Sequence, residues 1–129
     1  MKNSSTIPST AEDKLELLFR QQTQLIQEIK NTHNKMQEIY GIKEPFEGYR
    51  IFMLSSALMH EVIELQQETA WKWWKTSKEL SMEKCQDEVI DVWHFLIQLS
   101  IELKMDADTI VSRYLKKNRE NIHRQEEGY

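Results

Sequence analysis

The chain has 129 residues, a formal net charge of −4 and 40% apolar residues, but only three glycines and two prolines. This length suits one domain with its own core, and the scarcity of glycine and proline disfavours a fold of many short strands. The acidic balance argues against binding to duplex nucleic acid, which normally requires a basic surface. A single cysteine, Cys85, excludes an intrachain disulfide and a multi-cysteine zinc cluster.

The N-terminal segment has the features of neither a signal peptide nor a membrane anchor. Residues 1–9 are polar, and we expect a flexible tail there, followed by a single domain over residues 10–129. The longest apolar run, residues 89–101, is too short to span a bilayer and is interrupted by Asp91, His94 and Gln98. We therefore expect a cytoplasmic protein without a membrane partner.

Hydrophobic periodicity predicts a first helix in the N-terminal third of the chain. Thr10 and Asp13 have the spacing of a capping box, which predicts a helix that starts near Thr10 and runs to about Thr32. Gln22 lies inside the apolar stripe of this helix, where another apolar residue is expected. Gln22 is therefore a candidate for a role other than packing.

Further helices are predicted along the rest of the chain. The helical period marks residues 49–69, and the Trp-Lys-Trp-Trp-Lys cluster of residues 71–75 then reads as a loop or a fraying helix end. Apolar residues lie nearly all round residues 82–103, which predicts a central, buried helix. A last helix is expected over residues 109–125. Together these segments predict an all-α fold, a four- to five-helix bundle that pairs with a copy of itself.

Two pairs of acids, each with a spacing of three residues, lie in the apolar stripes of two different helices. Glu61 and Glu64 form the first pair, and Glu88 and Asp91 form the second. Burying four carboxylates close together is unfavourable unless cations neutralise them. An all-oxygen ligand set suits Mg²⁺, with Mn²⁺ as a substitute. One such pair would be an ordinary surface feature, but two pairs favour a metal site.

Two other metal chemistries use residues similar to these acids. His60 and Glu61 start a segment similar to the HExxH helix of zinc proteases, but Glu64 stands where the second histidine belongs. A di-iron carboxylate bundle needs two Glu-x-x-His pairs, whereas only Asp91 and His94 approximate one. Zinc proteolysis is therefore disfavoured, and the di-iron site stays open as a weaker alternative.

The order ExxE followed by ExxD, with three further segments, resembles the dimeric dUTPase family. This family belongs to the all-alpha nucleoside triphosphate pyrophosphatases, with MazG-type and dCTP-directed enzymes. The further segments are Trp71 to Lys75, Val92 to Phe95, and the motifs between Tyr114 and Tyr129. The resemblance covers residues 60–129 well and the first helix loosely. Many family members are longer, and Ile26 stands where their first-helix motif often has Asn or Asp.

The resemblance implies roles for particular residues. The four acids would hold magnesium ions that bridge a triphosphate, and we expect Glu61 to orient or deprotonate the attacking water. The uracil pocket would be built by Gln22, Trp73, His94 and Phe95. The remaining substrate contacts would come from Lys75, Lys117, Asn118, Asn121, Arg124 and Tyr129. On the residues alone, His94 and Phe95 could equally be core, and the last helix could be a solvated charged face.

Together with the four acids, the resemblance implies a magnesium-dependent enzyme that hydrolyses dUTP, with dUDP as a further candidate substrate, to dUMP. Pyrophosphate is the second product with dUTP, and the reaction would limit uracil incorporation into DNA. A MazG-type or dCTP-directed pyrophosphatase stays open, as does a non-catalytic helical regulator that retains the bundle. The expected partners are the small nucleotide and, by resemblance, a second copy in a homodimer.

Overall fold

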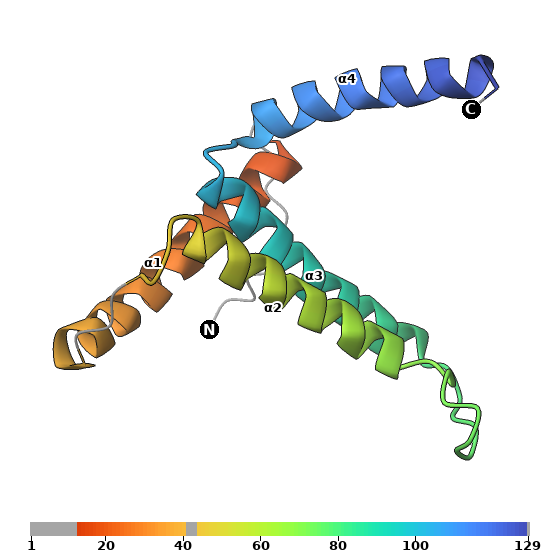
Figure 1. Cartoon of the computed structure of the whole chain (residues 1–129), viewed down its shortest axis with the longest axis horizontal. Coiled ribbons are helices and arrows are strands. Elements are labelled where there is room, and N and C mark those ends of the chain that lie inside the picture. The colour runs from red at the N-terminus through yellow and green to blue at the C-terminus, as the bar shows by residue number, and fades with distance from the viewer. Residues whose placement is uncertain (1–12, 41–43, 129) are drawn as a thin grey trace.

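The structure of the chain, a computed structural model, describes residues 13–40 and 44–128, with only the backbone of residues 32–40. It contains four helices: α1 (Lys14–Tyr40), α2 (Tyr49–Gln67), α3 (Met82–Glu102) and α4 (Ala107–Glu126) (Figure 1). The described residues contain no strand. The predicted all-α fold is therefore confirmed.

Local capping explains where three of the helices begin. The side chain of Ser81 accepts a hydrogen bond from the N–H of Lys84 at 3.3 Å, just before α3. Asp106 precedes α4, and its Oδ1 accepts bonds from the N–H and the hydroxyl of Thr109, at 2.8 and 2.7 Å. Gly48 precedes α2 with a φ of 81°, a conformation that glycine adopts without strain. These three helices lie within two residues of their predicted bounds.

The first helix is longer than predicted. It runs to Tyr40, eight residues beyond the predicted end, because no glycine or proline interrupts the chain before Gly41. At its start, Oδ1 of Asp13 accepts a hydrogen bond from the N–H of Leu15 at 3.1 Å. The expected start near Thr10 and the expected tail lie outside the described residues.

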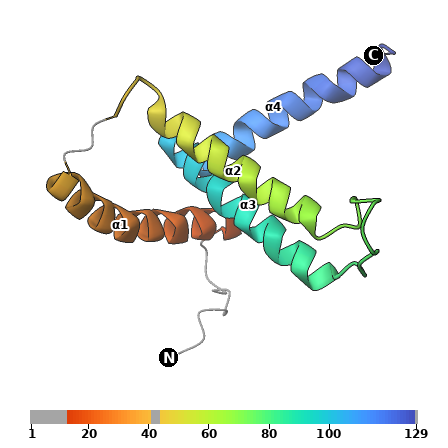
Figure 2. The ribbon, with the colours of Figure 1, turned by 60° about the horizontal axis from the view of Figure 1, so that its bottom comes forward.

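The helices pack unequally. α2 and α3 form an antiparallel hairpin with the most extensive contact, and α1 packs across α3. Between described residues, α4 makes a small contact with α1 and none with α2 or α3. Figures 1 and 2 both show α4 diverging from the hairpin, so that the two arms form an open V. The predicted bundle therefore consists of α1 to α3, and α4 leaves it.

A tight turn sets the direction in which α4 leaves. The N–H of Lys104 donates to the carbonyl of Ile101 at 2.9 Å, and the N–H of Met105 donates to the carbonyl of Ser100 at 3.0 Å. This pair of bonds ends a helix with one residue in the left-handed region, here Lys104 with a φ of 63°. Asp106 caps α4 immediately after this turn. The hydrogen bonds of the turn and of the cap therefore set the direction in which α4 leaves α3.

The core of a single chain is small. No described side chain is fully buried, and the residues that approach burial are Ile26, Ile97, Ala107, Gln22 and Ser100. α3 is central, as predicted, because it contacts both α1 and α2. The prediction that it is buried is wrong for one chain, since Ile90 is 53% and Trp93 is 45% exposed. The reason is that α4 turns away instead of covering α3.

No helix among the described residues is long and apolar enough to cross a membrane.

The hydrogen bonds that cap α4 predict how a substitution of Asp106 changes thermal stability. Asp106→Ala removes the acceptor of both Thr109 hydrogen bonds, so we expect a thermal midpoint lower by a few degrees. These bonds hold the pKa of Asp106 below its ordinary value. The stabilisation is therefore present above the unfolded pKa and is lost as the pH falls through the folded pKa. Circular dichroism melts of equal concentration measure it, with Glu120→Ala as the exposed control on α4. Equal midpoints for both variants would contradict the assignment.

Candidate active site

The four predicted acids meet between α2 and α3. Each offers one oxygen atom, and these atoms all lie within 4.8 Å of one another; the residues are Glu61, Glu64, Glu88 and Asp91. Residues three apart share one face of a helix, and the antiparallel hairpin turns the two acidic faces toward each other. The spacing in the sequence thus becomes one carboxylate cluster in space.

The four acids differ in burial. Glu64 and Asp91 are exposed, whereas Glu61 and Glu88 are half-buried. The Oε2 atoms of Glu61 and Glu88 are buried and have no hydrogen-bond partner among the described residues. A buried acceptor without a partner costs free energy, and such an atom calls for a functional explanation. These two oxygens therefore point to a ligand.

Electrostatics within the cluster favour protonation when no cation is present. Burial is the main reason why the pKa of Glu61 lies above its ordinary value, and a hydrogen bond with Glu64 and the charge of Glu64 add to the rise. The pKa of Glu88 is raised in the same way, by burial first and then by the charges of Glu64 and Asp91. A cation in the cluster would reverse this preference.

The donor set fits a hard divalent cation. Magnesium binds oxygen at about 2.1 Å in an octahedron, so opposite ligands lie about 4.2 Å apart. The observed spread of 4.8 Å is close enough for small rotations of the side chains to complete the coordination. Glu61 and Glu88 would supply the buried ligands, and the exposed side would leave positions for water and phosphate oxygens.

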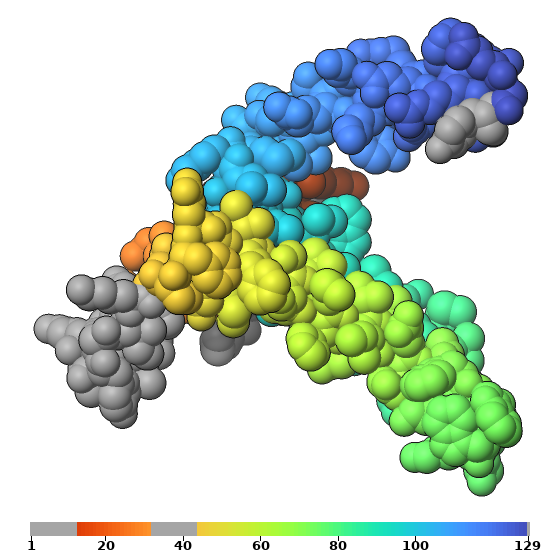
Figure 3. Space-filling model, viewed as in Figure 1, coloured from red at the N-terminus to blue at the C-terminus, as the bar shows by residue number. Residues whose placement is uncertain are grey.

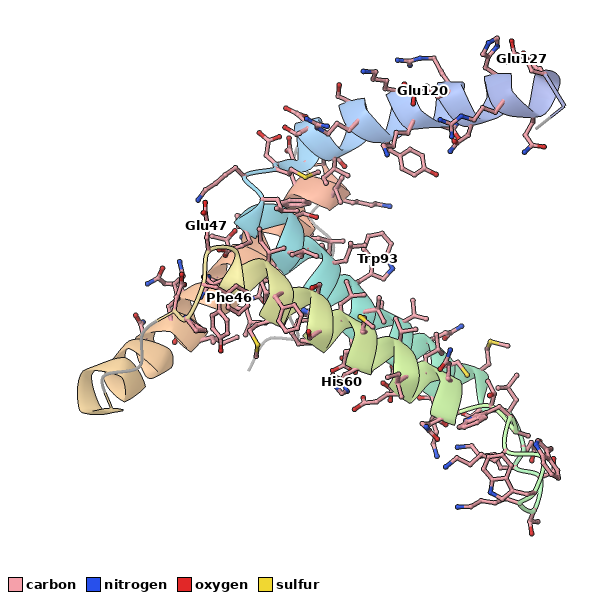
Figure 4. All side chains as sticks on the ribbon, viewed as in Figure 1. Phe46, Glu47, His60, Trp93, Glu120 and Glu127 are labelled. Carbon is pink, nitrogen blue, oxygen red and sulfur yellow. The ribbon has the colours of Figure 1, made fainter. Side chains whose placement is uncertain are left out.

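The neighbouring histidines do not join the cluster. His60 projects from α2 on the side away from α3 (Figure 4) and is exposed, and His94 bonds to Gln22. Among the described residues, the four acids form the only group of three or more possible metal-binding side chains. This geometry disfavours the zinc and di-iron alternatives, which need imidazole ligands.

A small hollow of about 190 Å³ lies between α1 and α3 and contains two of the predicted base-binding residues. Its lining residues are Leu18, Gln22, Ile90, Trp93, His94 and Ile97. Oε1 of Gln22 lies 2.9 Å from Nδ1 of His94, and Nε2 of Gln22 donates to Oε1 of Gln98 at 3.4 Å. Gln22, the polar residue in the apolar stripe of α1, is therefore buried and hydrogen-bonded, and it faces a largely apolar hollow.

Trp93 is the aromatic residue of this hollow, and it is not among the residues predicted for the base pocket. Its signal was its place in the Val92 to Phe95 motif, beside His94. Trp73, which the family resemblance places in that pocket, is 87% exposed in the loop between α2 and α3, where its ring contacts Trp74 edge to face. Phe95 does not line the hollow. The structure thus brings Gln22 and His94 together, apart from Trp73 and Phe95.

The residues predicted to make the remaining substrate contacts do not gather in one place. A hollow of about 640 Å³ beside the first half of α4 is lined by Lys117, Asn118 and Asn121, together with Arg113 and residues 103–105. Lys75 lines a different hollow, in the loop after α2. None of the four acids lines either hollow. Arg124 lies exposed further along α4, and Tyr129 lies outside the described residues.

Comparison with known proteins identifies the family. The model of a family described as dUTPase matches residues 14–110, about three quarters of the chain. The chain belongs to this dUTPase family. The matched segment contains the acid cluster and the hollow around Gln22, and it ends at Ile110, before Lys117, Asn118 and Asn121 of α4. No solved structure matches the chain.

Two relatives from bacteriophages are similar to part of the chain. A dCTP pyrophosphatase of Enterobacteria phage T4 is 31% identical over 78 residues, which is 51% of this chain and 46% of that protein. A dCTP pyrophosphatase of Enterobacteria phage LZ5 is 36% identical over 78 residues, 51% of this chain and 45% of that protein. The match therefore spans less than half of each relative. This member of the dUTPase family is thus also similar to proteins named for a cytosine nucleotide.

A metal titration tests whether the acid cluster binds a divalent cation. Glu88→Gln keeps the shape of the side chain but removes one charge from a buried ligand position, so we expect Mn²⁺ affinity to fall by about tenfold or more. Asp87→Asn changes an exposed neighbour on α3 and should leave the affinity unchanged. Calorimetry with Mg²⁺ and Mn²⁺ measures both variants. Equal affinities for wild type and Glu88→Gln would mean that the acids build no metal site.

The raised pKa values predict how stability depends on pH when no metal is present. Burial raises the pKa of Glu61, so the stabilisation linked to its proton is present below the unfolded pKa and is lost as the pH rises through the folded pKa. Metal-free Glu61→Gln should therefore melt above wild type at neutral pH, and this gap should close in mild acid. Melts in a chelator, repeated with Mg²⁺, measure this. A variant that melts below wild type at neutral pH would contradict the assignment.

Proposed function

We propose that this member of the dUTPase family is a magnesium-dependent enzyme that hydrolyses dUTP to dUMP and pyrophosphate. The observation that carries the proposal is the cluster of four carboxylates, with two buried oxygens that lack a hydrogen-bond partner among the described residues. The dUTPase family model, which spans this cluster, supports it. Hydrolysis of dUDP and a role in limiting uracil incorporation into DNA belong to the same proposal.

The reaction is an attack by water on a phosphorus of the α–β anhydride, in line with the bond that breaks. Bound magnesium would neutralise the negative charge of the phosphate chain. Glu61 orients the attacking water and accepts its proton, while pyrophosphate leaves with the electrons of the broken P–O bond. The half-buried position of Glu61 within the cluster suits a general base better than the exposed positions of Glu64 and Asp91.

The hollow around Gln22 is the proposed base site. The Gln22 amide has one donor and one acceptor edge, and its bonds to His94 and Gln98 hold it in a single orientation. An amide held in this way distinguishes uracil, which has a ring N–H and a carbonyl oxygen at its pairing edge, from cytosine, which has an acceptor and an amino group there. The aromatic face of Trp93, in the same lining, provides stacking.

A dCTP-directed pyrophosphatase is the second candidate. The observation that favours it is the name of both phage relatives, which are called dCTP pyrophosphatases. The chemistry at the acid cluster would be the same, and only the base site would differ. A non-catalytic regulator is disfavoured because all four acids are retained and brought together.

Two further features complete the proposal. We infer a homodimer, because one chain leaves large apolar side chains of α3 uncovered outside the proposed base site, among them Val89 and Leu96. We also infer a cytoplasmic location, where deoxynucleoside triphosphates serve DNA synthesis. Size-exclusion chromatography with light scattering measures the oligomeric state directly.

A panel of nucleotides tests the substrate. With Mg²⁺ we expect kcat/KM for dUTP to exceed that for dCTP by about a hundredfold or more, since a site built to hydrogen-bond one base leaves polar groups unpaired with another. Release of pyrophosphate measures turnover. A preference for dCTP would select the second candidate, and no pyrophosphate from any nucleotide would remove the enzymatic function.

Two variants separate chemistry from base selection in the same assay. Glu61→Gln should lower kcat for every nucleotide by about a hundredfold or more, because it removes the general base. Gln22→Ala should instead raise KM and reduce the ratio between dUTP and dCTP. A Gln22→Ala variant with unchanged selectivity would show that base recognition lies elsewhere.

A further inference from the structure

Three polar side chains form a continuous hydrogen-bond chain between α1 and α3. Gln22 comes from α1, whereas His94 and Gln98 come from α3, where a spacing of four residues places them one helical turn apart on the same face. Oε1 of Gln22 lies 2.9 Å from Nδ1 of His94, and Nε2 of Gln22 donates to Oε1 of Gln98 at 3.4 Å. The Gln22 amide therefore links the two side chains of α3.

The direction of these bonds determines the tautomer of His94. The carbonyl oxygen of an amide only accepts, so the bond at Oε1 of Gln22 requires a proton on Nδ1 of His94. A neutral imidazole carries one N–H, so Nε2 is then an acceptor. The opposite order is also consistent: a flipped Gln22 amide would donate to Nδ1 and accept from Gln98, and Nε2 of His94 would carry the proton. The orientation of Gln22 therefore decides whether this nitrogen accepts or donates.

His94 is the member of the chain that a ligand in the base hollow can reach. Gln22 is only 4% exposed, whereas His94 is exposed, and both line the hollow. Nε2 of His94 has no hydrogen-bond partner among the described residues. Trp93, in the same lining, points toward the side on which α4 diverges (Figure 4), and the arm formed by α4 stands apart from the α2–α3 hairpin (Figure 3). A ring nitrogen of His94 is thus available to a base beside Trp93.

Gln98 holds the other end of the hydrogen-bond chain and lies outside the base hollow. It lines a separate hollow of about 210 Å³, together with Lys30 and Arg50, and it does not line the hollow around Gln22. Its amide has both a donor and an acceptor edge, and its Nε2 has no hydrogen-bond partner among the described residues. Gln98 can therefore act on the base hollow only through Gln22.

We propose that Gln98 is a positioning residue that selects the nucleobase, because it orients the Gln22 amide and thereby sets the tautomer of His94. In the observed order, Nε2 of His94 accepts, which suits the ring N–H of uracil. In the reverse order it donates, which suits the unprotonated ring nitrogen of cytosine. This inference rests on the proposed function for the position of the base. It goes beyond that function because selection then depends on a residue that does not touch the base.

Two substitutions of Gln98 test the proposal by fixing the hydrogen-bond chain in opposite directions. Gln98→Glu offers only acceptors and keeps the observed order, whereas Gln98→Lys offers only donors and reverses it. We expect the ratio of kcat/KM for dUTP to that for dCTP to be about tenfold or more higher in Gln98→Glu than in Gln98→Lys. The new charge cancels in this ratio, because both substrates carry the same triphosphate. A smaller difference, or the opposite order, would overturn the proposal.

Two further variants control these measurements. Gln24→Glu and Gln24→Lys make the same changes of charge at an exposed position of α1, and both should keep the wild-type ratio. If Gln98→Lys does not fold, as judged by circular dichroism, Gln98→Met takes its place. It removes both hydrogen-bonding groups, so its ratio should lie below that of Gln98→Glu, and equal ratios would overturn the proposal.

The tautomer of His94 gives a readout that a merely structural role of Gln98 would not move. Nitrogen-15 NMR of the imidazole rings distinguishes a proton on Nδ1 from one on Nε2, in mildly alkaline buffer where histidine is normally neutral. The chain has four histidines, and loss of one set of signals in His94→Asn identifies those of His94. We expect the proton on Nδ1 in wild type and Gln98→Glu, and on Nε2 in Gln98→Lys. The same tautomer in both Gln98 variants would overturn the proposal.

The two readouts separate this inference from the proposed function. NMR needs no nucleotide, so it tests the hydrogen-bond chain even if no substrate is hydrolysed. In that case the proposed function fails, and the ratio of the dissociation constants of dCMP and dUMP replaces the kinetic ratio, with the same expected order of the variants. If the enzyme hydrolyses dUTP and the tautomer changes but the ratio does not, the proposed function stands and the role of Gln98 in base selection is overturned.

Discussion

Four carboxylates meet where α2 packs against α3, and their mutual repulsion must be offset for this packing to persist. The α2–α3 hairpin has the most extensive helix contact in the chain, and this same contact brings Glu61, Glu64, Glu88 and Asp91 within 4.8 Å of one another. Two of their oxygens are buried without a hydrogen-bond partner among the described residues. The apolar packing of α2 against α3 therefore holds four mutually repelling carboxylates close together. A bound divalent cation would remove this repulsion by neutralising their charge, and the binding of the cation would then stabilise the fold.

In the proposed site, α3 carries metal-binding residues on one face and base-binding residues on the neighbouring face. One face presents Glu88 and Asp91 to α2, and the neighbouring face presents Trp93 and His94 to the hollow beside α1. His94 follows Asp91 by three residues, about one helical turn, so the hollow lies beside the acids along the same helix. Membership of the dUTPase family and similarity to phage dCTP pyrophosphatases are compatible with this division, because the acid cluster can stay constant while the base site changes.

The fourth helix is the part of the chain that packing within one copy does not explain. α4 has its own cap and a defined direction, yet it covers neither of the helices that carry the acids. Its cations follow the end of the family match. The exposed apolar side chains of this arm, Tyr114 and Leu115 among them, are therefore left uncovered by the other described helices.

Helix positions and the acid cluster could be predicted from the sequence, because caps, apolar period and i, i+3 spacing are local properties of the chain. The family resemblance that followed from Glu61, Glu64, Glu88 and Asp91 was confirmed. Local patterns could not reveal that Trp93, rather than Trp73, shares a hollow with Gln22, that α3 stays half-exposed in one chain, or that α4 leaves the bundle. Those features depend on the angles between helices, which are set by the α3–α4 turn and by contacts between residues distant in sequence, so no local pattern in the chain encodes them.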